Sequence, residues 1–160
     1  MTSEQINLVQ ASFRQVLPLA ETAAKVFYKR LFELDESLQA LFTNDMLTQG
    51  NKLMQFLGLA VVSLNKFEQL QPALRTLGAR HVAYGVLEED YDTVGRALLW
   101  TLERILGDTF TPELEEAWIK IYAMISAEMK AGAATKPLPP LDINATHKLN
   151  RAERQTQPLN

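Results

Sequence analysis

Hydrophobic residues recur every three or four positions over most of the chain, the spacing that lines one face of an α-helix. The first helix is expected to start near Thr2 and Gln5, which have the spacing of a capping box. A second helix is expected to begin soon after Pro18. The apolar positions that define these two helices are Ile6, Val9, Phe13, Val16, Ala23, Phe27 and Leu31. Each helix therefore has one apolar face available for packing.

The middle of the chain alternates between helical and polar stretches. Residues 35–42 have the pattern of a short helical turn, and the polar residues 43–50 are expected to form a connecting loop. A further helix follows, and its apolar positions are Leu53, Phe56, Leu57, Ala60, Val61 and Leu64. Residues 67–81 predict another helix, in which Pro72 either lies in the first turn or divides the helix in two.

Two well-marked helices complete the pattern. The apolar stripe that starts at Tyr91 ends at Gly107, a suitable C-terminal cap. Thr111 and Pro112 form a typical helix start. The apolar positions of the last helix are Leu114, Trp118, Ile121, Ile125 and Met129. Because the chain shows neither strand alternation nor an internal repeat, the predicted fold class is all-α.

The composition changes near residue 132. Residues 133–160 contain four of the seven prolines of the chain and few large apolar residues. We therefore expect an extended, flexible tail there rather than a second domain. The folded domain is expected to span residues 1–132, which is long enough to enclose a hydrophobic core.

Composition and charge argue against several classes of partner. Of the 160 residues, 47% are hydrophobic and 22% are charged, as in an ordinary soluble globular protein. The net charge of −3 gives no electrostatic reason to expect nucleic acid or an anionic membrane as partner. The first residues lack the pattern of a secretory signal, and no apolar run reaches the roughly eighteen residues of a membrane span. We therefore expect a cytoplasmic protein.

Candidate chemistry is concentrated at one histidine. The chain has no cysteine, no hydrolase motif and no phosphate-binding glycine loop, and its other histidine, His147, lies in the predicted tail. The acidic residues 88–90 have the character of a solvated helix end. His81, next to Arg80, can either cap the end of a helix or bind the metal of a cofactor such as haem. Composition and spacing alone favour the cap.

Three segments change that balance. They are YKRLFELDESLQALF at 28–42, LGARHVAYGV at 77–86 and DTVGRALLWTLERILGDTFTPELEEAWIKIY at 92–122, and they resemble the globin family. The similarity is greatest to single-domain bacterial globins, to the globin domains of flavohaemoglobins and to neuroglobin. It covers roughly residues 3–130 and implies a globin fold, with helices packed around haem b (iron protoporphyrin IX). The resemblance also implies binding of oxygen and other small gases such as NO and CO.

The resemblance assigns roles to individual residues. His81 matches the proximal histidine, whose imidazole binds the haem iron and leaves the opposite face open for a gas. Phe42 matches the phenylalanine that packs flat on the porphyrin. Tyr28 matches the position on the second helix where bacterial members commonly place a distal tyrosine. Without the resemblance, Tyr28 would be interpreted as a half-buried aromatic residue.

The distal position on the following helix is open between two residues. A spacing of 32 residues before His81, as in bacterial globins and neuroglobin, selects Gln49, whereas a shorter connection selects Lys52. Helical phase favours Gln49, because it shares a face with Leu53, which would then form an apolar wall over the iron. Lys52 would lie at the pocket edge, where it either pairs with a haem propionate or stays solvated. Arg80 is a weaker candidate for the same pairing.

Two departures from the relatives bear on activity. The distal side has no histidine, so the ferrous iron should be mainly five-coordinate, and Tyr28 and Gln49 would donate hydrogen bonds to a gas. Tyr91 matches the tyrosine that assists the proximal histidine in flavohaemoglobins, but Ala133 stands where they have a glutamate. Glu128 is five residues earlier and lies on a different side of the helix. These differences weaken peroxidase-like activity.

The resemblance therefore implies, first of all, a protein that binds oxygen reversibly. Nitric-oxide dioxygenation is the alternative, and it would require an external reductase, because no flavin or nicotinamide domain accompanies the globin-like part. A gas sensor that acts through the tail and a globin that has lost its haem are further interpretations. The presence of His81, Phe42, Tyr28 and Gln49 together argues against the last of these.

Overall fold

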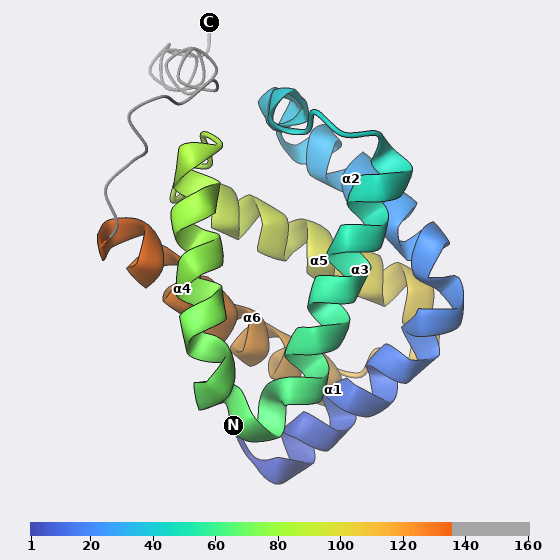
Figure 1. Cartoon of the computed structure of the whole chain (residues 1–160). Helices are drawn as coiled ribbons and strands as arrows, with labels where there is room; N and C mark the ends of the chain where they lie inside the picture. The colour runs from blue at the N-terminus through green and yellow to red at the C-terminus, as the bar shows by residue number, and fades with distance from the viewer. Residues whose placement is uncertain (136–160) are drawn as a thin grey trace, which may run out of the picture.

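The structure is a computed structural model that describes residues 1–135. Within that range every regular element is a helix, so the all-α prediction is confirmed (Figure 1). The α-helices are α1 (Ser3–Val16), α2 (Ala20–Leu34), α3 (Met46–Val62), α4 (Phe67–Ala83), α5 (Asp90–Leu106) and α6 (Pro112–Thr135). Short 3-10 turns are η1 (Leu17–Leu19), η2 (Glu36–Leu41), η3 (Ser63–Lys66) and η4 (Gly107–Thr109). The predicted tail from 133 thus begins inside α6, and the rest of it lies outside the described residues.

Three helix ends follow the predicted capping signals. Thr2 and Gln5 form the capping box of α1, with each side chain accepting a backbone N–H of the other residue at 3.1 Å. The Thr111 hydroxyl oxygen accepts the N–H of Leu114 at 3.3 Å and so caps the start of α6. Gly107 follows the last residue of α5 with φ of +56°, a conformation that glycine adopts without strain. These local signals are confirmed.

The loop predicted over residues 43–50 is wrong. The turn over Glu36–Leu41 is present as expected, but α3 already begins at Met46. Asp45 is its N-cap, since one carboxylate oxygen accepts the Thr48 N–H at 2.9 Å and the other accepts the Thr48 hydroxyl at 2.7 Å. The polar character of this stretch therefore reflects the exposed first turns of a helix, and Asp45 was the signal for its start. At the other end, Leu64 lies in η3 rather than in the α-helix.

Pro72 neither lies in the first turn of α4 nor divides the helix, so both expectations for it are wrong. Pro72 lies beyond the first turn, and the helix continues through it to Ala83. Proline removes one backbone N–H and so leaves the carbonyl of the residue four positions earlier without its helical partner. That residue is Glu68, which is exposed, as is Pro72 itself. Water can satisfy the carbonyl there, and packing along the rest of α4 holds the helix together.

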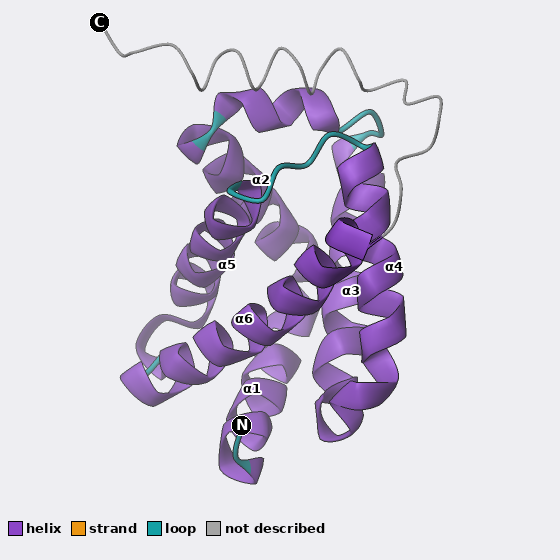
Figure 2. Ribbon diagram, turned by 90° about the vertical axis from the view of Figure 1, so that its left-hand side faces the viewer, coloured by secondary structure: helices purple, strands orange, loops and turns teal. Residues whose placement is uncertain are grey.

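The core joins α1 to the first half of α6. Trp118 and Ile121 of α6 and Val9 of α1 are each at most 1% exposed. The indole N–H of Trp118 donates to the buried Ser12 hydroxyl at 3.0 Å, so the polar end of this large ring is satisfied. Full burial of each apolar side chain contributes about 1.5–3 kcal/mol of transfer free energy. Figure 2 shows α6 running across both α1 and α4.

The helix α4 packs chiefly on α6. A Cβ atom built on Gly78 would lie 1.8 Å from the Met129 carbonyl oxygen, and one built on Gly132 would lie 2.0 Å from the Arg75 carbonyl oxygen. The two helices therefore touch backbone to backbone, and only glycine fits at these positions. Arg75 Nε also pairs with Glu128 Oε2 at 2.8 Å, which fixes the relative register of the helices.

The helices α2, α3 and α5 form the other part of the fold. The helix α2 packs on α5 and crosses α3 where Gly50 meets Ala24; a Cβ on Gly50 would lie 2.9 Å from the Ala24 Cβ. Although α3 and α4 are joined through η3, the two helices scarcely pack on one another in the described chain. In Figure 1 α3 ends and α4 begins at the same, lower end of the molecule, with α3 against α2 and α4 against α6. None of the described helices is long and apolar enough to cross a membrane.

Candidate cofactor site

His81 lies in the last turn of α4, and its side chain is held by the helix itself. The imidazole Nδ1 lies 2.8 Å from the carbonyl oxygen of Leu77, one turn earlier. Because a carbonyl can only accept a hydrogen bond, Nδ1 carries the proton and Nε2 keeps its lone pair. Burial lowers the pKa of His81, and the hydrogen bond to Leu77 only partly opposes this shift. A neutral imidazole with a fixed tautomer is the state in which histidine binds a metal.

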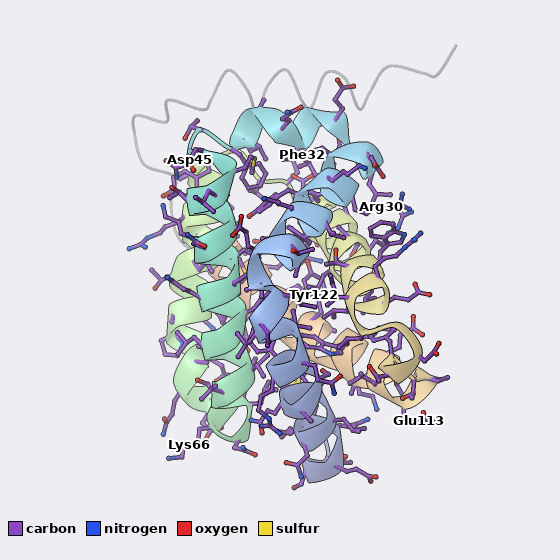
Figure 3. All side chains as sticks on the ribbon, turned by 90° about the vertical axis from the view of Figure 1, so that its right-hand side faces the viewer. Arg30, Phe32, Asp45, Lys66, Glu113 and Tyr122 are labelled. Carbon is purple, nitrogen blue, oxygen red and sulfur yellow. The ribbon has the colours of Figure 1, made fainter. Side chains whose placement is uncertain are left out.

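Tyr28 and Phe42 meet on the other side of the proposed site. Their ring centroids are 5.3 Å apart in an edge-to-face arrangement, and Phe32 completes the cluster at 6.0 Å from Tyr28 and 5.6 Å from Phe42. Figure 3 shows Phe32 of α2 and Asp45, which precedes α3, at the same end of the molecule. The end of η2 thereby places Phe42 directly against α2.

The structure also brings Tyr28 and Gln49 together. The Tyr28 hydroxyl donates to the backbone carbonyl oxygen of Gln49 at 3.4 Å, a long hydrogen bond. Burial raises the pKa of Tyr28 to about 12 and outweighs the opposing hydrogen bond with Gln49. Tyr28 is therefore a protonated hydroxyl that can donate at any physiological pH. Leu53 lies one turn beyond Gln49 on α3, half-buried against the core, as the predicted helical phase requires.

The remaining predicted residues are less tightly held. Lys52 and Arg80 are exposed, and no ion pair joins either of them to another described residue. Tyr91 is buried in the first turn of α5, and its hydroxyl has no hydrogen-bond partner among residues 1–135. Burial and the nearby Asp90 raise the pKa of Tyr91 to about 12. Lys130 places its ammonium 5.5 Å from the Tyr91 ring.

The acidic residues 88–90 behave only partly as predicted. Glu88 and Glu89 are exposed, as expected of a solvated helix end, but Asp90 is only 2% exposed. The prediction of a solvated Asp90 is wrong because its carboxylate accepts the backbone N–H of Leu87 at 2.7 Å. This hydrogen bond compensates for removing the charge from water.

The sequence interpretation missed two contacts of the candidate residues, although their spacing could have indicated them. Leu77, whose carbonyl fixes the His81 ring, precedes it by four residues, and Phe32 follows Tyr28 by four residues. Glu128 was correctly placed away from Ala133, and its carboxylate binds Gln71 at 3.0 Å and Arg75 at 2.8 Å. The carboxylate of Glu128 is thus engaged elsewhere on α4.

These residues could hold a large, flat, mostly apolar group between α3 and α4. His81 offers an Nε2 lone pair from α4, and the aromatic cluster with Gln49 lies on α2, η2 and α3. The two facing helices scarcely pack on one another, and both carry half-buried apolar side chains, including Leu53 and Leu77. No hydrogen bond or ring contact among the described residues joins His81 directly to the Tyr28 side. A bridging group with a metal centre would connect the two sides.

Comparisons with known proteins show the family of this chain. The family model for Globin matches residues 25–129. Neuroglobin of Tetraodon nigroviridis is 30% identical over 148 residues, covering 84% of this chain and 93% of that protein. Neuroglobin of Chaenocephalus aceratus is 34% identical over 123 residues, covering 68% of this chain and 77% of that protein.

A solved structure shows the same fold. It is that of RmaNOD, an engineered carbene transferase from Rhodothermus marinus, with a TM-score of 0.75 and 24% sequence identity. The match covers 84% of this chain and 94% of that chain. The fold is therefore that of an all-α protein of the same class. The chain belongs to the globin family, and haem and the binding of small gases such as oxygen follow from that membership.

Proposed function

We propose that this globin binds oxygen reversibly at a haem b held by His81 alone. The observation that carries the proposal is the Nδ1 hydrogen bond of His81 to the Leu77 carbonyl at 2.8 Å, which leaves Nε2 free to bind iron. Haem, when bound, supplies the ferrous iron to which diatomic gases attach. With haem bound, Phe42 would pack on the porphyrin, and Leu53 would keep water away from the gas side. Lys52 and Arg80 are free to reach the propionates from the exposed surface.

The distal chemistry comes from Tyr28 and Gln49. Tyr28 keeps its proton because its pKa is about 12, so the hydroxyl can turn from the Gln49 carbonyl toward a gas. The Gln49 amide is a second donor on the same side. Each hydrogen bond in a water-poor pocket contributes about 1 kcal/mol, and two of them slow the release of oxygen. No histidine lies on α2 or α3, so these helices offer no imidazole to compete with the gas.

Nitric-oxide dioxygenation is the second candidate function. The closeness of Tyr28 to the backbone of Gln49 favours it, because the Tyr28 hydroxyl and the Gln49 amide would orient oxygen for reaction with NO to give nitrate. RmaNOD, whose fold this chain shares, is named for that activity. A separate reductase would return the iron to the ferrous state after each turnover. Peroxidase-like chemistry is disfavoured, because the Nδ1 of His81 donates to a neutral carbonyl rather than to a carboxylate.

Absorption spectra of the purified protein test the proposal. We expect a Soret band in the ferric, dithionite-reduced and CO-bound states, and a five-coordinate spectrum in the reduced state. Absence of the band after addition of haem would refute the haem site. The rate of NO consumption with a reductase, compared with the rate of oxygen release, then separates the two functions. NO consumption that is slower than oxygen release identifies a reversible carrier or store.

A further inference from the structure

The connection between α4 and α5 begins with a hydrogen-bonded helix end at His81. The Val86 N–H donates to the carbonyl oxygen of His81 at 3.0 Å, and the Gly85 N–H donates to that of Val82 at 3.0 Å. This pair of bonds is a Schellman motif, in which the residue after the cap adopts positive φ. Gly85 has φ of +95°, which a residue with a side chain rarely adopts. The backbone of His81 is thereby tied to the loop that follows it.

The same loop is tied to α5 one residue further on. The Leu87 N–H donates to Asp90 Oδ2 at 2.7 Å, and the Asp90 N–H donates back to the Leu87 carbonyl oxygen at 3.1 Å. Asp90 is the first residue of α5 and is 2% exposed, so the acceptor side of its bond to Leu87 is shielded from water. Hydrogen bonds to a carboxylate are stronger than those between neutral groups. Leu87 and Asp90 therefore hold each other by two bonds.

We propose that Asp90 is a positioning residue that fixes the turn carrying His81 relative to α5. The consecutive amides of Val86 and Leu87 bind the His81 carbonyl on one side and the Asp90 carboxylate on the other. Because α4 packs chiefly on α6 while α5 packs chiefly on α2, this loop transmits the position of α5 to His81. The role of Asp90 toward iron rests on the proposed function, but its hold on the turn does not.

Three variants distinguish an effect of Asp90 on the position of the His81 turn from an effect on the stability of the whole fold. Asp90→Ala removes the acceptor of the Leu87 N–H, whereas Asp90→Asn keeps an oxygen in the same place. Ser12→Ala is the matched control, because it also leaves a buried N–H unpaired, that of Trp118, but between α1 and α6. Asp90→Ser, whose hydroxyl is too short to reach the loop, replaces Asp90→Ala if that variant does not fold.

Amide hydrogen exchange of the purified protein gives a readout that needs no activity. We expect the amides of Tyr84 to Leu87 to exchange at least tenfold faster in Asp90→Ala, at close to the wild-type rate in Asp90→Asn, and unchanged in Ser12→Ala. A Leu87 amide that already exchanges like an unprotected amide in the wild type overturns the proposal. So does equal protection in wild type and Asp90→Ala.

The iron–histidine stretching band of the reduced, gas-free protein gives the second readout. We expect it to shift or broaden in Asp90→Ala and to be restored in Asp90→Asn, with no change in Ser12→Ala. An identical band in all four proteins overturns the role of Asp90 in positioning His81. If the wild type forms no Soret band but its loop amides respond as expected, the proposed function fails while the hold of Asp90 on the turn stands.

Discussion

The turn that carries His81 is held by backbone contacts, whereas the region around Tyr28 is held by aromatic side chains. Around His81, the Leu77 carbonyl fixes the imidazole, Val86 binds the His81 carbonyl, and Gly78 lets α4 touch the backbone of α6. Around Tyr28, rings meet edge to face, and the one hydrogen bond of the hydroxyl measures 3.4 Å.

The two kinds of contact suit residues with different requirements for movement. Backbone hydrogen bonds and helix backbones in contact have few alternative arrangements, so they suit a residue that must keep one position toward a metal. Aromatic rings and a long hydrogen bond rearrange at little cost, so they suit a residue that responds to an arriving gas. A groove of about 470 Å³ lies beside Tyr28 between α2 and α3, lined also by Phe32, Met46 and Gly50.

The largest expected effect is that of His81→Ala on haem binding. We expect the variant to keep its helical circular dichroism, because α4 packs on α6 through other residues, and to lose iron ligation completely. The Soret band after haem titration measures this loss. Arg80→Ala is the control, since Arg80 is exposed and adjacent and should leave the spectrum unchanged apart from weaker haem retention. An unaltered spectrum in His81→Ala would remove His81 from the site.

Glycine-to-alanine substitutions compare how rigidly the chain is packed near His81 and near Tyr28. Gly78→Ala places a Cβ 1.8 Å from the Met129 carbonyl oxygen, and we expect it to lower the free energy of unfolding by about 3 kcal/mol. Gly50→Ala meets only the Ala24 methyl at 2.9 Å, which predicts a smaller loss of about 1 kcal/mol. Urea denaturation measures both values.

Gly58→Ala is the control for these two variants. Its new Cβ would lie 3.5 Å from the Phe13 ring, an ordinary contact, so alanine should stabilise α3 by about 0.5–1 kcal/mol. Equal losses of unfolding free energy in Gly78→Ala and Gly50→Ala would contradict the difference between the region around His81 and the region around Tyr28.

The variant Tyr28→Phe tests the region around Tyr28, whose contacts rearrange at little cost. We expect oxygen release to become about five- to tenfold faster, because loss of one hydrogen bond raises the free energy of the bound state by about 1–1.4 kcal/mol. Stability should change little, since only a 3.4 Å bond to Gln49 is lost. Stopped-flow replacement of oxygen by CO measures the rate. Unchanged release in both Tyr28→Phe and Gln49→Leu would eliminate the distal hydrogen bonds.

The smallest expected effect is a pH dependence of the haem-free protein. Burial depresses the pKa of His81 in the folded state, so the unfolded chain binds more protons near and below the ordinary pKa of 6.5. The contribution of His81 to stability is therefore present above that pKa and is lost as the pH falls. Urea midpoints at pH 7.5 and 5.5 should differ more in the wild type than in His81→Gln. The opposite order would contradict burial of a neutral imidazole.

Sequence predicted the fold well where the cause is local. The capping pair of Thr2 and Gln5, the Thr111 cap and Gly107 each act within one helical turn, so the relevant residue types are adjacent in the chain. The start of α3 was missed because Asp45 stands in a polar stretch that resembles a loop. Gln49 nevertheless shares a helical face with Leu53, because the helix already includes both.

Tertiary contacts limited the prediction of the site. Nothing local shows that Asp90 is buried while Glu88 and Glu89 are exposed, since its burial depends on how the loop folds back onto α5. Likewise, the meeting of Gly78 with Met129 joins residues that are far apart in the sequence. The resemblance to globins assigns roles to His81, Phe42 and Tyr28, but it gives no information about the contacts that hold them.

The crossing of α4 and α6 also limits how this sequence can change over time. Gly78 and Gly132 each face the backbone of the opposite helix rather than a side chain. A larger residue at either position therefore has no compensating substitution on the partner helix, because a backbone cannot be made smaller. Any lineage that gains a side chain there must move α4 and, with it, the histidine. Both glycines are expected to persist in descendants that keep this site.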